Sequence, residues 1–401
     1  MGRISNILSK FFLFFGLLLF SLVSHTIYAW SIGLVCIIFF VIIEKISLKN
    51  KAIFESFLLF FILLIAIVRF QIDLIDKVLP IFSISFWGNA SVLCLCILVW
   101  LFFRSILLDN KNKLIIRILP IILWLHIIAF YVQSILFLLT GYYLDFVEPF
   151  TGIKSRFDTF VNSTISGIGS FRPTGFMAEP STYFFVVLVL ASLIVINKGF
   201  QRNRIVLILT IISMYLSFST AAVIIATVFI IYLFLILRVR IFYYFILLFL
   251  GLGIFFFIGS SIFQLFLFQQ DKYVETSDLR ENLVLMVINR ELDDAIFAYG
   301  PFAVDKEIAR SSTGGGDNSI ASLNDAGVLI FLWLEFGYLG ILIFVLMCYR
   351  QKKIGLKHVL LFLIISFTKI NPFSPFFIIF WGVSILSERN EKKDKLSPAL
   401  A

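Results

Sequence analysis

Long runs of apolar residues, separated by short polar stretches, follow one another along almost the entire chain. A helix that spans a bilayer needs about 20 predominantly apolar residues. On that criterion the runs predict twelve helices, at 8–25, 27–43, 52–69, 79–103, 115–139, 179–197, 204–217, 221–237, 241–267, 326–348, 357–370 and 375–387. The pattern therefore predicts an all-α polytopic membrane protein, with a single integral membrane domain over residues 1–401.

The connections between these helices differ sharply in length. Two are long, over 140–178 and 268–325, and the others are short turns. Long loops in a compact protein are usually functional. The short helix pairs 204–217/221–237 and 357–370/375–387 are expected to form hairpins, the second turning where prolines break the helix. The first apolar run is expected to remain as a helix, because no small-residue cleavage site follows it.

The composition supports a membrane location. The chain is 61% hydrophobic and 14% charged, whereas soluble domains carry about 25% charged residues. The four cysteines all lie in apolar runs: Cys36, Cys94, Cys96 and Cys348. They predict neither a disulfide framework nor a metal site. The three histidines lie in or beside membrane segments, and we expect them to be packed or interfacial: His25, His126 and His358.

The basic residues predict an orientation. With the N-terminus in the cytoplasm, two thirds of the 33 basic residues fall in the inner connections. Few acids lie with them: Glu44, Glu55, Asp109, Glu388, Glu391 and Asp394. This bias is the positive-inside pattern. It accounts for the net charge of +9 without nucleic acid, and it places both termini, including a tail over 388–401, in the cytoplasm and both long loops outside.

The inner connections exclude an ATP-driven pump. They are too short to hold a nucleotide-binding domain, and the chain has no GxxxxGK[ST] sequence. The glycine run at 314–316 is followed by Asp-Asn rather than Lys-Ser. It indicates a flexible turn rather than a phosphate-binding loop.

The first long loop ends in SFRPTGFMAEPST, residues 170–182. Glu179 and Pro180 predict a helix start, and Gly175 predicts a turn before it. One interpretation is structural, with Glu179 as a cap and Arg172 as a solvated anchor at the membrane surface. The other is functional, because ionisable groups at membrane depth are costly and usually have a role.

The second long loop carries further candidates. Its apolar periodicity predicts an amphipathic helix over 278–298 lying along the membrane surface. The outer side then gathers five arginines: Arg156, Arg172, Arg280, Arg290 and Arg310. The planar guanidinium suits phosphate oxygens, so this side of the chain suggests a lipid-linked phosphate or pyrophosphate. Solvated surface charges are the alternative. Glu335 precedes Gly337 and Gly340, whose spacing favours close helix packing.

Three short sequences together resemble a known family. They are R-P-x-G-x-x-x-E-P at 172–180, the hairpin tip Ser217-Phe-Ser-Thr-Ala221, and E-x-G-x-x-G at 335–340. With the two long outer loops, they resemble the bacterial O-antigen and capsule repeat-unit polymerases of the Wzy type. O-antigen ligases of the same superfamily share this layout. They typically carry a histidine in the large outer loop, and this chain has none there.

The resemblance implies a GT-C-like glycosyltransferase in the bacterial inner membrane that needs neither a metal nor another cofactor. Such an enzyme transfers a growing glycan from undecaprenyl pyrophosphate to the non-reducing end of a lipid-linked repeat unit at the outer face of that membrane. The implied partners are the undecaprenyl-pyrophosphate-linked oligosaccharide, membrane lipids, a chain-length regulator and a flippase. The alternatives are an O-antigen ligase and a non-enzymatic flippase or exporter.

The resemblance also assigns roles to individual positions. It implies Arg172 as a pyrophosphate clamp and Glu179 as its orienting partner or as the base. Arg280 and Arg310 match the loop arginines of the family. The remaining candidates would contact the substrate: Arg290 and Arg156 as further cations, and Asn318 and Asn324 as hydrogen-bond partners of sugar hydroxyls.

Overall fold

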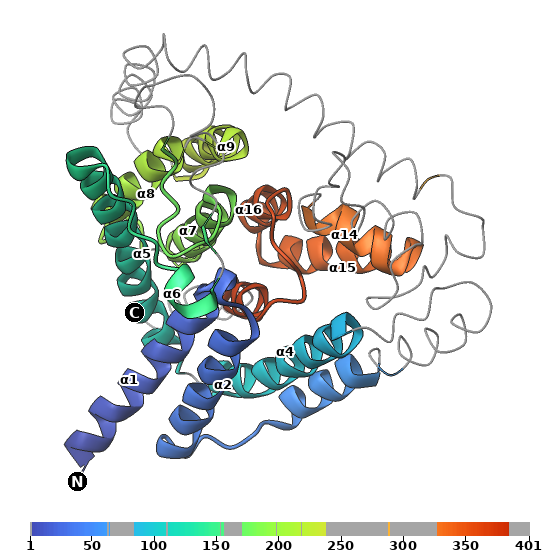
Figure 1. Cartoon of the computed structure of the whole chain (residues 1–401). Helices are drawn as coiled ribbons and strands as arrows, with labels where there is room; N and C mark the ends of the chain where they lie inside the picture. Colours follow the sequence, from blue (N-terminus) through green and yellow to red (C-terminus); the bar gives the residue numbers. More distant parts are fainter. Residues whose placement is uncertain are drawn as a thin grey trace, which may run out of the picture.

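A computed structural model of the chain describes residues 2–61, 64, 84–109, 111–152, 154–155, 171–197, 199–217, 219–237, 288 and 327–384. Every regular element within these ranges is a helix (Figure 1). Three helical stretches are long and apolar enough to cross a membrane: Ile4–Ser21, Ala90–Leu108 and Lys113–Thr140. The all-helical class is thus confirmed, and the apolar helices indicate a membrane protein. The count of twelve spanning helices stays a prediction.

Several of the helices begin and end within a few residues of the predicted segments. Their bounds are α1 Gly2–Ser21, η1 Val23–His25, α2 Thr26–Ile43, α4 Ile84–Leu108, α5 Asn112–Thr140, α6 Glu148–Thr151, α7 Pro180–Ile196, α8 Arg204–Leu216, α9 Thr220–Leu237, α14 Gly327–Phe336, α15 Tyr338–Ile354 and α16 Leu356–Ser366. Two further helical stretches cover 50–61 and Pro375–Ser384. The predicted helices over 241–267 and 278–298 lie outside the described residues, apart from Ile288.

Helix α7 lies at the centre of the bundle, with α5, α8, α9 and α16 around it (Figure 1). It is apolar on all sides, which is the pattern of a buried helix. Every residue from Tyr183 to Ile196 is buried. One internal contact fixes its rotation, because the Tyr183 hydroxyl donates to Ser213 Oγ of α8 at 2.8 Å. The three histidines of the chain are also buried, as the packing interpretation predicted.

The predicted single helix over 326–348 is wrong, because the chain breaks at Gly337. This residue has φ +61° and separates α14 from α15. Gly340 lies against α14: a Cβ atom placed on it would come 1.9 Å from the Leu332 carbonyl oxygen. Eight positions of a continuous helix span about 12 Å, so α15 folds back onto α14. The packing interpretation of Gly340 is confirmed.

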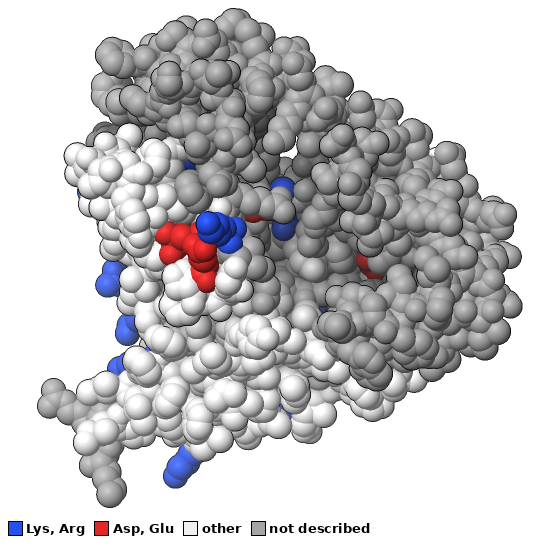
Figure 2. Space-filling model, viewed as in Figure 1, with Lys and Arg blue, Asp and Glu red and all other residues white. Residues whose placement is uncertain are grey.

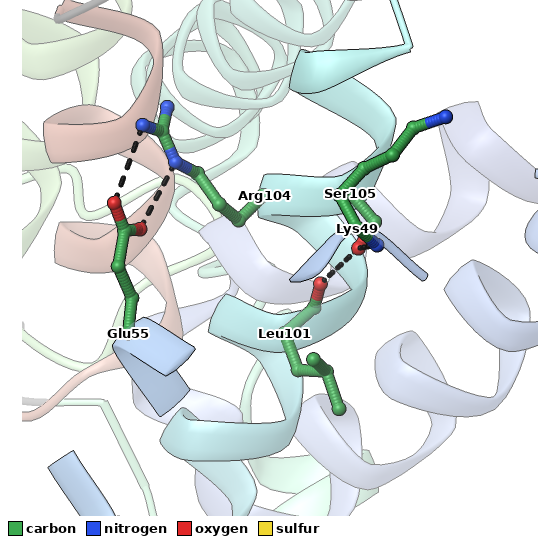
Figure 3. Close-up of polar contacts among 5 residues, drawn as sticks. All are labelled: Lys49, Glu55, Leu101, Arg104 and Ser105. Carbon is green, nitrogen blue, oxygen red and sulfur yellow. Dashed lines mark hydrogen bonds and ion pairs between the residues drawn. The ribbon is translucent and has the colours of Figure 1, made fainter. Parts of the chain in front are cut away.

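Ion pairs tie together the end of the bundle that the charge bias assigns to the cytoplasm. Three acids each meet a base: Asp109 with Lys49 at 2.9 Å, Glu55 with Arg104 at 3.1 Å and Glu44 with Lys111 at 2.6 Å. Arg104, with its side chain 4% exposed, directs two guanidinium nitrogens at Glu55 (Figure 3). Beside it, Ser105 Oγ donates to the Leu101 carbonyl and accepts from the Lys49 N–H. The pair of Arg104 and Glu55 joins the helical stretch 50–61 to α4.

Candidate functional site

The segment 171–179, which precedes α7, runs down the side of α5 into the bundle. Three contacts mark its path: Phe171 stacks on Phe137 with centroids 3.9 Å apart, the N–H groups of Thr174 and Gly175 donate to Gln133, and Phe176 meets the His126 ring edge-on at 5.5 Å. From Phe137 to His126, α5 rises by about 16 Å. We call residues 171–179 the re-entrant segment, because they lead from the first loop back along α5 into the bundle. Helix α7 therefore starts beside the middle of α5 rather than beside its C-terminal end.

Gln133 of α5 holds this segment in place. Its Oε1 accepts the backbone N–H of Thr174 at 2.7 Å and that of Gly175 at 2.9 Å, while its Nε2 donates to the Leu144 carbonyl at 2.7 Å. The side chain is completely buried. Buried non-helical backbone requires partners for its polar groups, and one amide supplies two of them here. Gln133 thus connects α5, the start of the first loop and the re-entrant segment.

The predicted turn and helix start are both present. Gly175 has φ +55°, and the Met177 N–H donates to the Thr174 carbonyl at 3.0 Å, which closes a turn. A Cβ atom on Gly175 would lie 3.1 Å from the Tyr183 ring, so both the backbone angle and the space favour glycine. Helix α7 then begins at Pro180, with Glu179 as its N-terminal flanking residue.

The start of the first loop forms a polar layer next to this segment. Asp145 accepts the N–H groups of Val147 and Glu148 on one oxygen and both the N–H and the hydroxyl of Ser155 on the other. Burial raises the pKa of Asp145, but these hydrogen bonds outweigh it, so the pKa lies below its ordinary value. The Tyr143 hydroxyl shares hydrogen bonds with Ser155 at 2.6 Å and Thr174 at 2.9 Å.

Glu179 occupies the predicted capping position, yet its carboxylate does not cap the helix. No hydrogen bond runs from the first-turn N–H groups to this side chain. The Glu179 Oε2 atom instead accepts the Ser181 hydroxyl at 3.1 Å and lies 3.5 Å from Lys369 Nζ. The interpretation of Glu179 as a side-chain cap is therefore wrong, because its carboxylate contacts the Ser181 hydroxyl and Lys369 instead of the first-turn N–H groups.

Lys369 comes from the connection between α16 and the helix at 375–384. This connection packs deep among other helices: the Cys96 thiol of α4 donates to the Phe373 carbonyl at 3.1 Å, and the Phe373 ring meets Phe331 of α14. Thr368 and Ile370 on either side of the lysine are buried, whereas its own side chain is 22% exposed. A single cation thus emerges from a buried hairpin tip toward the start of α7.

Arg172, which lies in the re-entrant segment, is a second cation that interacts with Glu179. Its side chain is partly buried. Burial lowers the pKa of Arg172 to about 10, while the negative charge of Glu179 acts in the opposite direction. The guanidinium therefore stays protonated at neutral pH, in surroundings where its charge is poorly solvated. Figure 2 shows acidic and basic side chains next to each other on one face of the molecule.

Two of the predicted site residues, Arg172 and Glu179, are thus close enough for the charge of Glu179 to raise the pKa of Arg172. Glu335 is buried near the end of α14, at the Gly337 break. The remaining candidates lie outside the described residues: Arg156, Arg280, Arg290, Arg310, Asn318 and Asn324. Within the described ranges, no three His, Cys, Asp or Glu side chains gather closely enough to hold a metal ion.

Sequence reasoning left Gln133 and Lys369 out of the site. Gln133 carries a signal that could have been used, since it is a polar amide inside the apolar run 115–139 and such groups are usually hydrogen-bonded to a neighbouring segment. Lys369 lies next to the Asn371-Pro372 turn, so a hairpin tip was predictable there. Its pairing with Glu179 depends on how the helices pack, which no local pattern encodes.

Comparisons with known proteins identify no family. No family model matches the chain, and no curated protein or solved structure is detectably similar to it.

Proposed function

We propose that this protein is a membrane glycosyltransferase that polymerises surface polysaccharide from lipid-linked repeat units. The observation that carries the proposal is that Glu179 pairs with Lys369 of the hairpin tip and also acts electrostatically on Arg172 of the re-entrant segment. Two cations and one carboxylate in a partly buried setting suit a reaction that expels a pyrophosphate. The three sequence motifs that resemble O-antigen and capsule polymerases add support, since two of the three residues belong to one of them.

The chemistry assigns a task to each group. The acceptor hydroxyl oxygen forms a bond to the anomeric carbon of the donor glycan, and the bond from that carbon to the pyrophosphate oxygen breaks. The electron pair leaves with undecaprenyl pyrophosphate, whose developing charge Arg172 stabilises, and one such donor contributes about 3 kcal/mol. Glu179 takes the hydroxyl proton as base or orients Arg172. Lys369, 3.5 Å from the Glu179 carboxylate, orients it.

The second candidate is a flippase or exporter of the same lipid-linked unit. It is favoured by the short helices α14 and α16, whose neighbouring turns lie inside the bundle, because transporters often build their sites from discontinuous helices. A polymerase makes a new glycosidic bond, whereas a flippase leaves the glycan unchanged. The product therefore separates the two candidates.

The deciding experiment uses the purified full-length chain with undecaprenyl-pyrophosphate-linked repeat units and no nucleotide. A polymerase yields glycans of two or more repeats and releases undecaprenyl pyrophosphate, and Arg172→Ala abolishes both. In cells, deletion of the gene should leave lipopolysaccharide core carrying one repeat. Core without any repeat would instead indicate a ligase or flippase, and unchanged long chains would exclude all three functions.

A further inference from the structure

An open pocket of about 510 Å³ lies at the opposite end of the bundle, between the start of α1, the end of α2 and the start of α5. Among the described residues, five basic side chains and a single acidic one line it: Lys10, Lys45, Lys111, Lys113, Arg117 and Glu44. The charge bias of the connections assigns this end to the cytoplasm. The pocket is therefore separate from the site around Arg172.

Glu44, the acidic residue among these, is already neutralised. Glu44 accepts a hydrogen bond from Lys111 Nζ at 2.6 Å, and this bond lowers the pKa of the carboxylate. The described residues that line the pocket thus carry more positive than negative charge. The start of α5 adds to it, because the first N–H groups of a helix present a partial positive charge.

Lys45 reaches the pocket from a backbone conformation that disfavours it. Its φ of +52° is the left-handed one that usually ends a helix at glycine or asparagine. The Ile46 N–H donates to the Val41 carbonyl at 3.0 Å and closes the same turn. A residue with a side chain is less stable than glycine in this conformation. A lysine here is explained if its charge has a function in the pocket.

The walls next to the pocket are apolar and open to lipid. On α1, Ile7, Leu8 and Phe11 are exposed beside Lys10. On α5, Arg117 stands at the head of an exposed stripe with helical spacing: Ile121, Trp124, Ile128, Val132 and Ile135. Two of the three helical stretches that could cross a membrane, Ile4–Ser21 and Lys113–Thr140, begin at this pocket. A phosphate held there would have acyl chains running along both helices.

We propose that this pocket binds the phosphate headgroup of an anionic phospholipid of the surrounding leaflet. Positive charge gathered in a concave site recognises the phosphate, and the exposed stripes on α1 and α5 take the acyl chains. A general positive-inside bias needs basic residues only in the connections, not converging on one hollow. A soluble phosphate compound would use the cations but would leave the stripes without a role.

The test measures lipid binding to the purified full-length protein in detergent by native mass spectrometry. Dioleoylphosphatidylglycerol is compared with dioleoylphosphatidylcholine, and thermal unfolding is followed with each lipid and with inorganic phosphate. Phosphatidylglycerol should bind more tightly and raise the unfolding temperature. Each removed cation should weaken its binding about fivefold, so the double variant Lys10→Gln/Arg117→Gln should lose most of the preference.

Two further variants separate binding from folding. Lys45→Gly relaxes the backbone and should weaken phosphatidylglycerol binding while the lipid-free protein unfolds at the same or a higher temperature. Lys352→Gln/Lys353→Gln removes two exposed charges of α15, outside the pocket, and should leave binding unchanged. The proposal would be overturned if the two lipids bound equally, or if the pocket variants bound phosphatidylglycerol as tightly as the unchanged protein. Protection by inorganic phosphate as strong as that by lipid would also overturn it.

Discussion

Lys369 Nζ lies 3.5 Å from Glu179 Oε2 and thereby joins the tip of one hairpin to the first turn of the central helix. Both side chains are partly exposed, 22% for the lysine and 25% for the glutamate. Because water screens such a pair, its contribution to stability is about 1 kcal/mol or less. Its interest lies in its position, since Glu179 pairs with Lys369 from a distant part of the chain and also acts electrostatically on Arg172.

The role of Glu179 can be separated from that of its partner. Glu179→Gln removes the charge but keeps the shape, and Lys369→Met removes the opposite charge. If the carboxylate is the base, Glu179→Gln should lower the polymerisation rate by about 100-fold or more, while Lys369→Met lowers it far less. Single-turnover rates on lipid-linked repeat units measure both. Equal losses in the two variants would instead assign Glu179 to the ion pair.

Gln133 should be essential for the path of the re-entrant segment. Gln133→Leu leaves the N–H groups of Thr174 and Gly175 without their acceptor, at a cost of about 2–5 kcal/mol for two buried donors. The variant should unfold at a lower temperature and admit protease near residues 171–179. Ser134→Ala is the matched control, because that hydroxyl bonds only to the Phe130 carbonyl of its own helix. A Gln133→Leu protein as stable as the control would contradict the assignment.

Two glycines should respond differently to alanine. In Gly340→Ala, the new methyl group would fall 1.9 Å from the Leu332 carbonyl, so α14 and α15 must separate, at about 2–4 kcal/mol. Gly141→Ala meets nothing within 4 Å and suffers only from its φ of +70°, about 1 kcal/mol. Thermal unfolding of the two variants side by side measures the difference. Similar losses would show that packing at Gly340 is unimportant.

The polar layer of the first loop should weaken in acid. Hydrogen bonding holds the folded-state pKa of Asp145 below its ordinary value of 3.8, so its contribution is complete at higher pH. That contribution is lost as the pH falls through 3.8 and then through the lower folded-state value. Hydrogen-exchange protection factors of the Val147, Glu148 and Ser155 amides should fall in this range. Asp145→Asn should be less protected at pH 6 and nearly insensitive to acid.

Much of the helical architecture was predictable from the sequence, because apolar runs in this chain are long and their ends are marked by proline, glycine or charge. Helix α7 begins at Pro180 as predicted, and the turn at 371–375 forms between two short helices. The error over 326–348 has a physical cause: Gly337 permits a positive φ, but nothing local requires the chain to use it.

The site was only partly predictable for a similar reason. Arg172 and Glu179 stand out as charges beside prolines, whereas the depth of their segment depends on Gln133, which belongs to a different helix. The pairing of Lys369 with Glu179 likewise depends on the packing of α16 against α7. Long-range contacts of this kind follow from the assembled bundle and leave no periodic signal.

The anchoring of segment 171–179 has a consequence for how this protein tolerates change. Gln133 accepts hydrogen bonds from the backbone N–H groups of Thr174 and Gly175, not from their side chains. One substitution on α5 would therefore displace Arg172, although the sequence of the segment itself is unchanged. A designer who wishes to alter substrate preference must therefore keep both Gln133 and Gly175, because both fix the route of the segment.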